Sequence, residues 1–126
     1  MPHRPPLIAV VDDEESVRRA LSRLLRSAGF ESETFPSGDE FIETFSGQPP
    51  DCIVVDLHMP NLDGFRIQSW MAKAGVRIPV IVITGHNSDE SRERAMKAGA
   101  VAYLRKPVDA EALLAAIASA MGNEKT

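Results

Sequence analysis

The strongest constraint on this chain is the alternation of short apolar runs with amphipathic stretches, which repeats five times. The runs expected to form strands are 6–11, 31–35, 52–55, 79–83 and 101–105. Four of them are almost wholly apolar and rich in β-branched residues, which is typical of parallel strands covered on both faces. The second run, 31–35, alternates polar and apolar side chains, and this indicates an edge strand.

The stretches between the runs carry helical patterns with recognisable ends. Apolar residues recur at helical spacing from Val17 to Ala28, and Gly29 is expected to end that helix. The other helices are expected from an N-cap at Ser37, over 64–73, over 88–98 with Gly99 as the stop, and from an N-cap at Asp109 to Met121 with Gly122 as the stop. Strand then helix, five times over, predicts a single-domain α/β fold: a doubly wound (βα)5 unit with a five-stranded parallel sheet and helices on both faces.

Composition sets the class of protein. The 126 residues fit one domain, and 122–126 is expected to be a short polar tail. The formal net charge of -4 argues against a nucleic-acid surface, and the single Cys52 excludes an internal disulfide and suits the cytoplasm. The apolar run that precedes Asp12 is too short for a signal sequence or a membrane span, so no membrane partner is expected.

Polar and charged residues follow four of the apolar runs at the point where each ends. They are Asp12 and Asp13, Asp56, Thr84, and Lys106. Ligands of doubly wound sheets bind outside the carboxyl ends of the strands, where these side chains would meet. Three carboxylates, a hydroxyl and an ammonium group are suited to a divalent cation and a phosphoryl group.

Each of these residues also has an ordinary structural explanation. Asp12 and Asp13 suit the N-terminus of a helix, and a threonine at a strand end is often a cap. A lone Lys106 would most often be a solvated surface charge. Their occurrence together, at equivalent ends of predicted strands, favours a shared site.

The residues that carry these patterns resemble the receiver domain of a two-component response regulator along nearly the whole chain. The matching motifs are Val-Val-Asp-Asp-Glu (10–14), Val-Val-Asp-Leu-His-Met-Pro-Asn-Leu-Asp-Gly (54–64), Val-Ile-Val-Ile-Thr-Gly-His (80–86), Ala-Met-Lys-Ala-Gly-Ala (95–100) and Tyr-Leu-Arg-Lys-Pro (103–107). The Thr-Gly-His run and the 94–100 stretch resemble the FixJ-like subgroup. The resemblance implies a receiver domain over 1–126 with the strand order 2-1-3-4-5.

The resemblance also implies a metal-dependent phosphoacceptor. Asp56 would take the phosphoryl group from a phosphohistidine. Asp12 and Asp13 would hold Mg²⁺ with Asp56 and the backbone carbonyl of His58, and Mn²⁺ would be able to substitute. Phosphoryl transfer needs in-line positioning and compensation of oxygen charge, which agrees with this set of residues.

The remaining roles implied by the resemblance concern the product. Thr84 and Lys106 would contact the phosphoryl group, and Lys106–Pro107 would be a cis peptide bond. Tyr103 would be the switch aromatic that moves inward, although a partly exposed tyrosine packed on the fourth helix is the alternative. His58 and His86 flank the site, and in the family their positions tune the lifetime of the phosphoryl group.

The leading interpretation is therefore a phosphoacceptor signalling switch rather than a turnover enzyme. Its implied partners are a cognate histidine kinase or phosphotransfer protein, with a homodimer formed on phosphorylation through the fourth helix, fifth strand and fifth helix. One alternative is a pseudo-receiver that acts as a constitutive interaction module. The presence of the acid pair together with Asp56, Thr84 and Lys106 argues against it. Another is an aspartate-nucleophile phosphatase, but such enzymes carry an Asp-x-Asp pattern on the first strand. A nucleotide binder would need a glycine-rich loop where the chain has acidic residues at 12–15.

Overall fold

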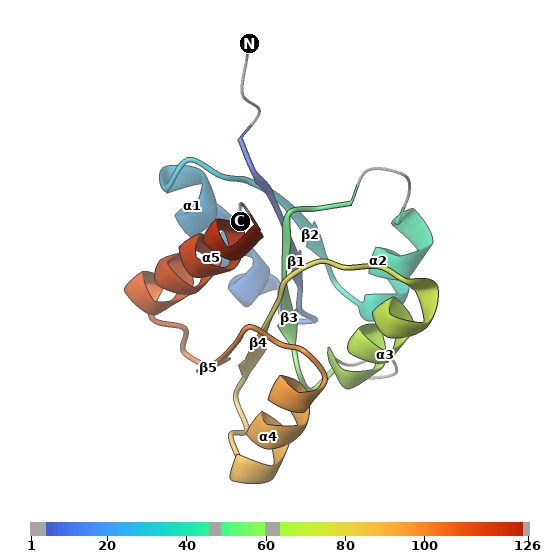
Figure 1. Ribbon diagram of the computed structural model, residues 1–126. Helices are drawn as coiled ribbons and strands as arrows, with labels where there is room; N and C mark the ends of the chain where they lie inside the picture. Colours follow the sequence, from blue (N-terminus) through green and yellow to red (C-terminus); the bar gives the residue numbers. More distant parts are fainter. Residues whose placement is uncertain (1–4, 46–48, 60–63, 125–126) are drawn as a thin grey trace.

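The computed structural model describes residues 5–45, 49–59 and 64–124. Within these residues, strands and helices alternate along the chain (Figure 1). The strands are β1 (Leu7–Val11), β2 (Glu31–Phe35), β3 (Cys52–Asp56), β4 (Val80–Thr84) and β5 (Ala102–Arg105). The helices are α1 (Glu15–Ser27), α2 (Gly38–Thr44), α3 (Gly64–Ala74), α4 (Asp89–Lys97) and α5 (Ala110–Glu124).

All strand pairs in the sheet are parallel, in the order β2-β1-β3-β4-β5, so the predicted fold class and strand order are confirmed. The polar run 31–35 does form an edge strand. In the register, Val11 of β1 lies beside Val55 of β3, and Asp56 lies beside Ile83 of β4. The carboxyl ends of β1, β3 and β4 therefore meet at one edge of the sheet.

Two hydrophobic layers cover the two faces of the sheet. One layer joins α1 and α5 to β-strand residues such as Val10, Val54 and Ile83. The other joins α2, α3 and α4 to the alternate residues of the same strands, such as Val11 and Val55. Figure 1 shows α1 and α5 on one side of the strands and α2 and α3 on the other. Burial on both faces explains why β1, β3 and β4 are almost continuously apolar.

Most of the predicted helix ends are confirmed. The Ser37 hydroxyl accepts a hydrogen bond from the Glu40 amide at 3.1 Å, and the Asp109 carboxylate accepts one from the Ala112 amide at 2.9 Å. Gly29 and Gly99 follow α1 and α4 with φ of 93° and 105°, a region that glycine enters without strain.

The predicted end of the last helix at Gly122 is wrong, because α5 continues to Glu124. Gly122 has no left-handed φ, and nothing lies within 4 Å of a Cβ built on it. A glycine in an exposed helix costs only about 1 kcal/mol and does not oblige the chain to turn. Residues 122–124 of the expected polar tail are thus helical, while 125–126 and residues 60–63 of the long motif lie outside the described residues.

No helix within 5–45, 49–59 and 64–124 is long and apolar enough to cross a membrane.

Gly64 begins α3 directly against the end of β3, and this close approach generates a prediction. A Cβ at Gly64 would lie 3.1 Å from Leu57 Cα and 3.2 Å from the Asp56 carbonyl oxygen, both of which are backbone atoms. We expect Gly64→Ala to lower the free energy of unfolding by about 1 kcal/mol, because overpacking outweighs the gain in helix propensity. Gly122→Ala is the matched control. The new Cβ meets open space there, so this substitution should stabilise the protein. Equal stabilisation of both variants in urea titrations would contradict this reading of the contact.

Candidate functional site

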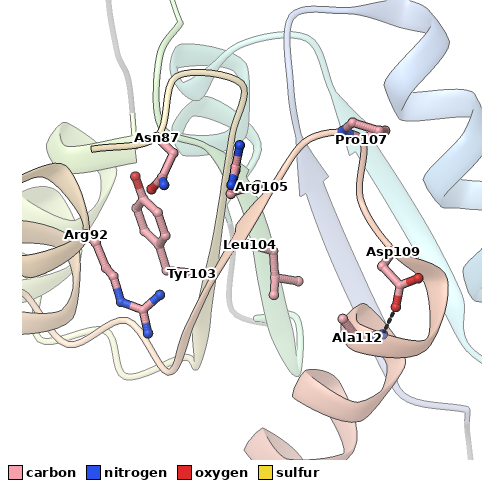
Figure 2. A pocket seen from close by; sticks show the side chains of 8 residues that line it. All are labelled: Asn87, Arg92, Tyr103, Leu104, Arg105, Pro107, Asp109 and Ala112. Atoms are coloured by element: carbon pink, nitrogen blue, oxygen red, sulfur yellow. Dashed lines mark hydrogen bonds between the residues drawn. The ribbon is translucent and has the colours of Figure 1, made fainter. Parts of the chain in front are cut away.

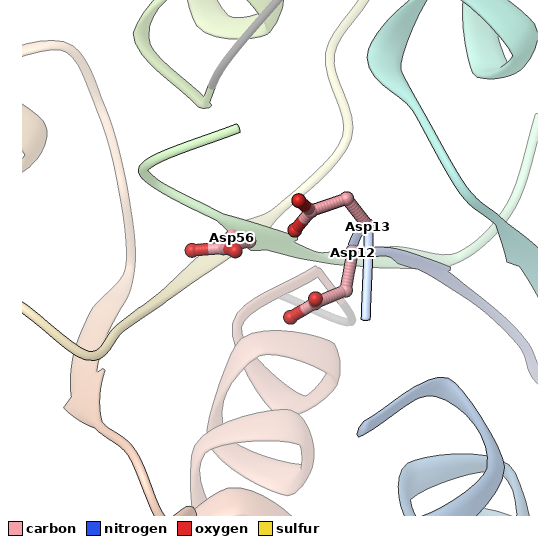
Figure 3. Close-up of side chains that lie close together, drawn as sticks. All are labelled: Asp12, Asp13 and Asp56. Carbon is pink, nitrogen blue, oxygen red and sulfur yellow. The ribbon is translucent and has the colours of Figure 1, made fainter. Parts of the chain in front are cut away.

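Three carboxylates converge at the carboxyl edge of the sheet. Asp56 is the last residue of β3, and Asp12 and Asp13 directly follow the neighbouring strand β1. Oxygens from these three residues lie within 4.8 Å of one another, and Figure 3 shows the Asp12 and Asp13 side chains turned to the side on which Asp56 lies. Asp12 and Asp56 are buried and Asp13 is exposed. The structure thus brings together the three acids predicted from the sequence.

Backbone amides fix two of the carboxylates. The Glu14 amide donates to Asp12 Oδ1 at 2.9 Å, and the His58 amide donates to Asp56 Oδ1 at 3.2 Å. Each bond joins an acid to the amide two residues later, a local turn that aspartate forms readily. Asp12 therefore caps this turn rather than α1, whose N-cap residue is Glu14 and makes no side-chain cap. The second oxygen of each buried acid is left to face the shared site.

One ammonium group compensates the cluster. Lys106 Nζ lies 3.0 Å from Asp12 Oδ2, 3.2 Å from Asp56 Oδ2 and 3.0 Å from Glu14 Oε1. Glu14 was not among the predicted site residues, although it stands in the acidic run after β1 that the sequence displays. An acid directly after a predicted metal-binding pair was the signal that could have identified it.

Burial sets the electrostatics of this cluster. Removal from water raises the pKa of Asp12, and the nearby charge of Asp13 adds to this effect. Burial also raises the pKa of Asp56, with the charge of Asp12 as the second cause. Burial opposes charge on Lys106, but its contacts with Asp12 and Glu14 prevail and raise its pKa above the ordinary value. The site therefore holds an excess of negative charge that one lysine does not neutralise.

The donor set fits a hard divalent cation. Asp12 Oδ2 is fully buried and contacts Lys106 as an ion pair, but within the described part of the chain it has no hydrogen bond of good geometry. A buried carboxylate oxygen in that position is open to a cation, as are the oxygens of Asp13 and Asp56. Mg²⁺ prefers such oxygens and retains several waters, for which the exposed side at Asp13 leaves access.

The structure does not place the Thr84 hydroxyl on the pocket that holds Asp56. Thr84 ends β4 and is buried. Its Oγ1 accepts from the His86 amide at 3.0 Å and donates to the His86 carbonyl at 3.3 Å. Both bonds are local, so Thr84 acts as a cap at the end of its strand, which is the ordinary structural role that the sequence analysis allowed for it.

Two histidines stand at the entrance to the acidic pocket. The pocket has a volume of about 200 Å³ and is lined by Asp13, Glu14, Asp56, His58, Gly85, His86 and Lys106. The imidazoles of His58 and His86 are exposed and meet edge to face, with ring centres 5.7 Å apart. They come from the loops after β3 and β4, which are neighbours in the sheet. Both histidines therefore line the same pocket as Asp56.

Comparison with known proteins decides the family. Residues 8–118 match the family model described as the response regulator receiver domain. The chain belongs to the response regulator receiver family. A receiver is a signalling switch and not a turnover enzyme, so the phosphatase alternative is excluded.

The relatives of this receiver include FixJ-like regulators. It is 37% identical over 119 residues to Nodulation protein W of Bradyrhizobium diazoefficiens, covering 94% of this chain and 52% of that protein. It is 37% identical over 114 residues to the transcriptional regulatory protein FixJ of the same organism, covering 90% of this chain and 56% of that protein. The solved structure of the response regulator StyR matches with a TM-score of 0.86 and 41% identity, covering 94% of this chain and 60% of that one. This chain spans about half the length of the curated relatives it matches.

The receiver also has a pocket of about 310 Å³ lined by residues of α4, β5, α5 and the loops that join them. Figure 2 shows the Tyr103 ring between Asn87 and Arg92 in this pocket. Tyr103 is 8% exposed and its hydroxyl has no hydrogen-bond partner among the described residues, while the Arg92 guanidinium lies 6.0 Å from the ring centre. Tyr103 is therefore buried and not partly exposed in this conformation, and it packs in the layer beneath α4 that this alternative expected.

The peptide bond between Lys106 and Pro107 in this receiver is cis, as the resemblance implied.

The contacts of Lys106 lead to a prediction about stability. In metal-free buffer, we expect Lys106→Met to lower the free energy of unfolding by about 2 kcal/mol or more, because buried Asp12 and Asp56 lose their compensating charge. Adding Asp12→Asn to this variant should restore part of the loss, since it removes one of the uncompensated charges. Chemical denaturation of the wild type and the two variants measures both effects. A double variant less stable than Lys106→Met would contradict the assignment of Lys106 as the compensating group.

Proposed function

We propose that the chain is a phosphoacceptor switch in which Asp56 accepts a phosphoryl group from a phosphohistidine on a histidine kinase or phosphotransfer protein. The observation that carries this proposal is the position of Asp56, buried and flanked by two acids yet lining an open pocket. Asp56 accepts from the His58 amide on one oxygen and pairs with Lys106 on the other, while its side chain still lines the open pocket. Receiver membership supports the same role.

The residues suit an in-line transfer. An Asp56 oxygen would form a bond to phosphorus as the bond from phosphorus to the donor imidazole nitrogen breaks, and solvent would return a proton to that nitrogen. Bound Mg²⁺, held by Asp12, Asp13, Asp56 and the His58 carbonyl, would offset repulsion between the carboxylate and the phosphoryl oxygens, and Mn²⁺ would serve in its place. Lys106, already 3.2 Å from Asp56 Oδ2, would pair with a phosphoryl oxygen after transfer.

The signal would then pass from Thr84 to Tyr103. We infer that the Thr84 hydroxyl leaves its bonds to the His86 backbone and donates to the phosphoryl group, since both present bonds are made to a loop residue only two positions away. This shift changes the space beside β4 into which the Tyr103 ring packs. The inward ring seen here would be the position that phosphorylation stabilises.

Labelling with acetyl phosphate tests the proposed function. We expect the wild-type protein to gain the mass of one phosphoryl group in the presence of Mg²⁺ and none in the presence of EDTA. Asp56→Ala should abolish the gain, and Asp13→Asn should raise the Mg²⁺ concentration that is needed. Asp39→Asn is the control, because Asp39 is an exposed acid in the first turn of α2.

The outcome that would overturn the proposal is a folded wild-type protein that does not label with Mg²⁺, which is the behaviour of a pseudo-receiver. The decay of the label reports a second property. We infer that His58 and His86 control access of hydrolytic water to Asp56, because both rings stand at the pocket entrance. Unchanged decay rates in His58→Ala and His86→Ala would contradict that role.

We also propose that phosphorylation favours a homodimer through α4, β5 and α5. Among the described residues, the large hydrophobic side chains that are exposed are Met96 and Val101, at 40% and 43%, and both belong to this surface. The alanines of α5 lie on two faces of the helix: Ala120 packs inward, while Ala115 and Ala118 are exposed. This domain would contact no nucleic acid directly, given its net charge of -4.

Sedimentation tests the dimer. We expect a mass near that of the monomer without a phosphoryl mimic and a shift toward the dimer with beryllofluoride and Mg²⁺. Met96→Ser combined with Val101→Ser should weaken the shift, since both changes remove exposed apolar area from the contact. An unaltered mass with the mimic, in protein that labels normally, would refute this part of the proposal.

A further inference from the structure

One contact in the acidic pocket has no part in the proposed phosphoryl transfer. The carboxylate of Glu14 accepts a hydrogen bond from Lys106 Nζ at 3.0 Å. Glu14 lines the same pocket as Asp56, and its side chain is 58% exposed. An exposed carboxylate gains little from one ion pair, so this contact has more consequence for Lys106 than for Glu14.

The position of Glu14 in the chain suits this contact better than it suits the helix that follows. Glu14 is the N-cap residue of α1, and its carbonyl oxygen accepts from the Arg18 amide at 3.1 Å. Its side chain makes no cap hydrogen bond. Serine, threonine, aspartate and asparagine are preferred at an N-cap because their short side chains reach the first amides of the helix. The glutamate therefore contributes little to α1, and its longer side chain reaches Lys106 instead.

The ammonium group of Lys106 is fully occupied in this conformation. It contacts the carboxylates of Asp12, Glu14 and Asp56 at distances of 3.0, 3.0 and 3.2 Å. An ammonium group has only three N–H donors, which is one for each of these carboxylates. A phosphoryl oxygen on Asp56 can therefore pair with Lys106 only if the lysine gives up one of its present contacts.

Glu14 is the carboxylate that Lys106 can leave at the lowest cost. The Asp12 side chain is completely buried, so its charge would lose compensation in a place that water does not reach. The contact with Asp56 becomes a contact with the phosphoryl group that Asp56 carries. The Glu14 carboxylate is more than half exposed, so solvent hydrates it once the lysine has left.

We propose that Glu14 is the resting-state counter-ion of Lys106 and competes for it with the phosphoryl group on Asp56. Glu14 is then a positioning residue, because it acts through Lys106 and does not itself touch the phosphoryl group. Its removal should favour the phosphorylated state, whereas removal of a residue that assists phosphorylation would disfavour it. This inference rests on the proposed function, since the competition requires a phosphoryl group at Asp56.

Nitrogen NMR of the lysine side chains tests the contact itself, in protein without Mg²⁺ or a phosphodonor. The Nζ signal of Lys106 is assigned by its absence in Lys106→Arg. We expect this signal to shift in Glu14→Gln, because the ion pair is replaced by a neutral contact. Glu15→Gln is the matched control, since it removes the same charge from the next residue, whose carboxylate pairs with Arg19. A Lys106 signal that is the same in the wild type and in Glu14→Gln would overturn the assignment of the counter-ion.

The affinity for beryllofluoride in excess Mg²⁺ tests the competition. Beryllofluoride takes the place of the phosphoryl group on Asp56, and fluorine NMR separates its bound and free signals. We expect Glu14→Gln to bind this mimic about two- to fivefold more tightly than the wild type does, the range that corresponds to one exposed ion pair. Glu15→Gln should bind it with the affinity of the wild type. The free energy of unfolding, measured in urea, should be nearly equal in the wild type and both variants.

The failure of this inference and the failure of the proposed function give different results. Equal or weaker binding of beryllofluoride in Glu14→Gln, in a wild-type protein that labels with acetyl phosphate, would overturn the competition and leave the phosphoacceptor role standing. Tighter binding of the same size in Glu15→Gln would also overturn it, because the effect would then come from net charge and not from the contact with Lys106. A wild-type protein that neither labels nor binds beryllofluoride would refute the phosphoacceptor role, and the competition with it.

Discussion

The structure depends on one electrostatic constraint, which is that three carboxylates are held together at the edge of a sheet where one lysine contacts two of them. Asp12 and Asp56 are buried side by side because β1 and β3 are neighbours in register. Burial raises the pKa of both groups, with a further rise from the charge of Asp13 on Asp12 and of Asp12 on Asp56, and Lys106 offsets only part of this effect. A cluster with this excess negative charge is suited to bind a cation. It is also suited to a ligand that takes over the contact that Lys106 now makes with Asp56.

The buried apolar strands of the sheet hold these carboxylates in place. β3 and β4 are buried along their whole length, and they end on the polar residues Asp56 and Thr84. The loops that follow can then differ in role without disturbing the sheet. One loop carries His58 and the other His86, and their approach at the pocket mouth is a property of the loops and not of the core.

Much of this could be predicted from the sequence. Periodicity predicted the strands and helices to within a few residues, and the position of Asp56 directly after an apolar strand pointed to the site. Resemblance to the family supplied the strand order and the roles. The end of α5 was predicted wrongly at Gly122, because a glycine allows a helix to stop without requiring it. Glu14 was missed because its contact with Lys106 spans 92 residues of sequence.

The sequence by itself determined the type and order of the elements and the chemistry available at the strand ends, since these follow from local periodicity and residue type. Only the tertiary structure decided which of these side chains contact one another. It placed Lys106 between Asp12, Glu14 and Asp56, and buried the Tyr103 ring. Each of these outcomes depends on which strands are neighbours and how their loops pack, and distances between residues far apart in the chain exist only once the sheet has formed.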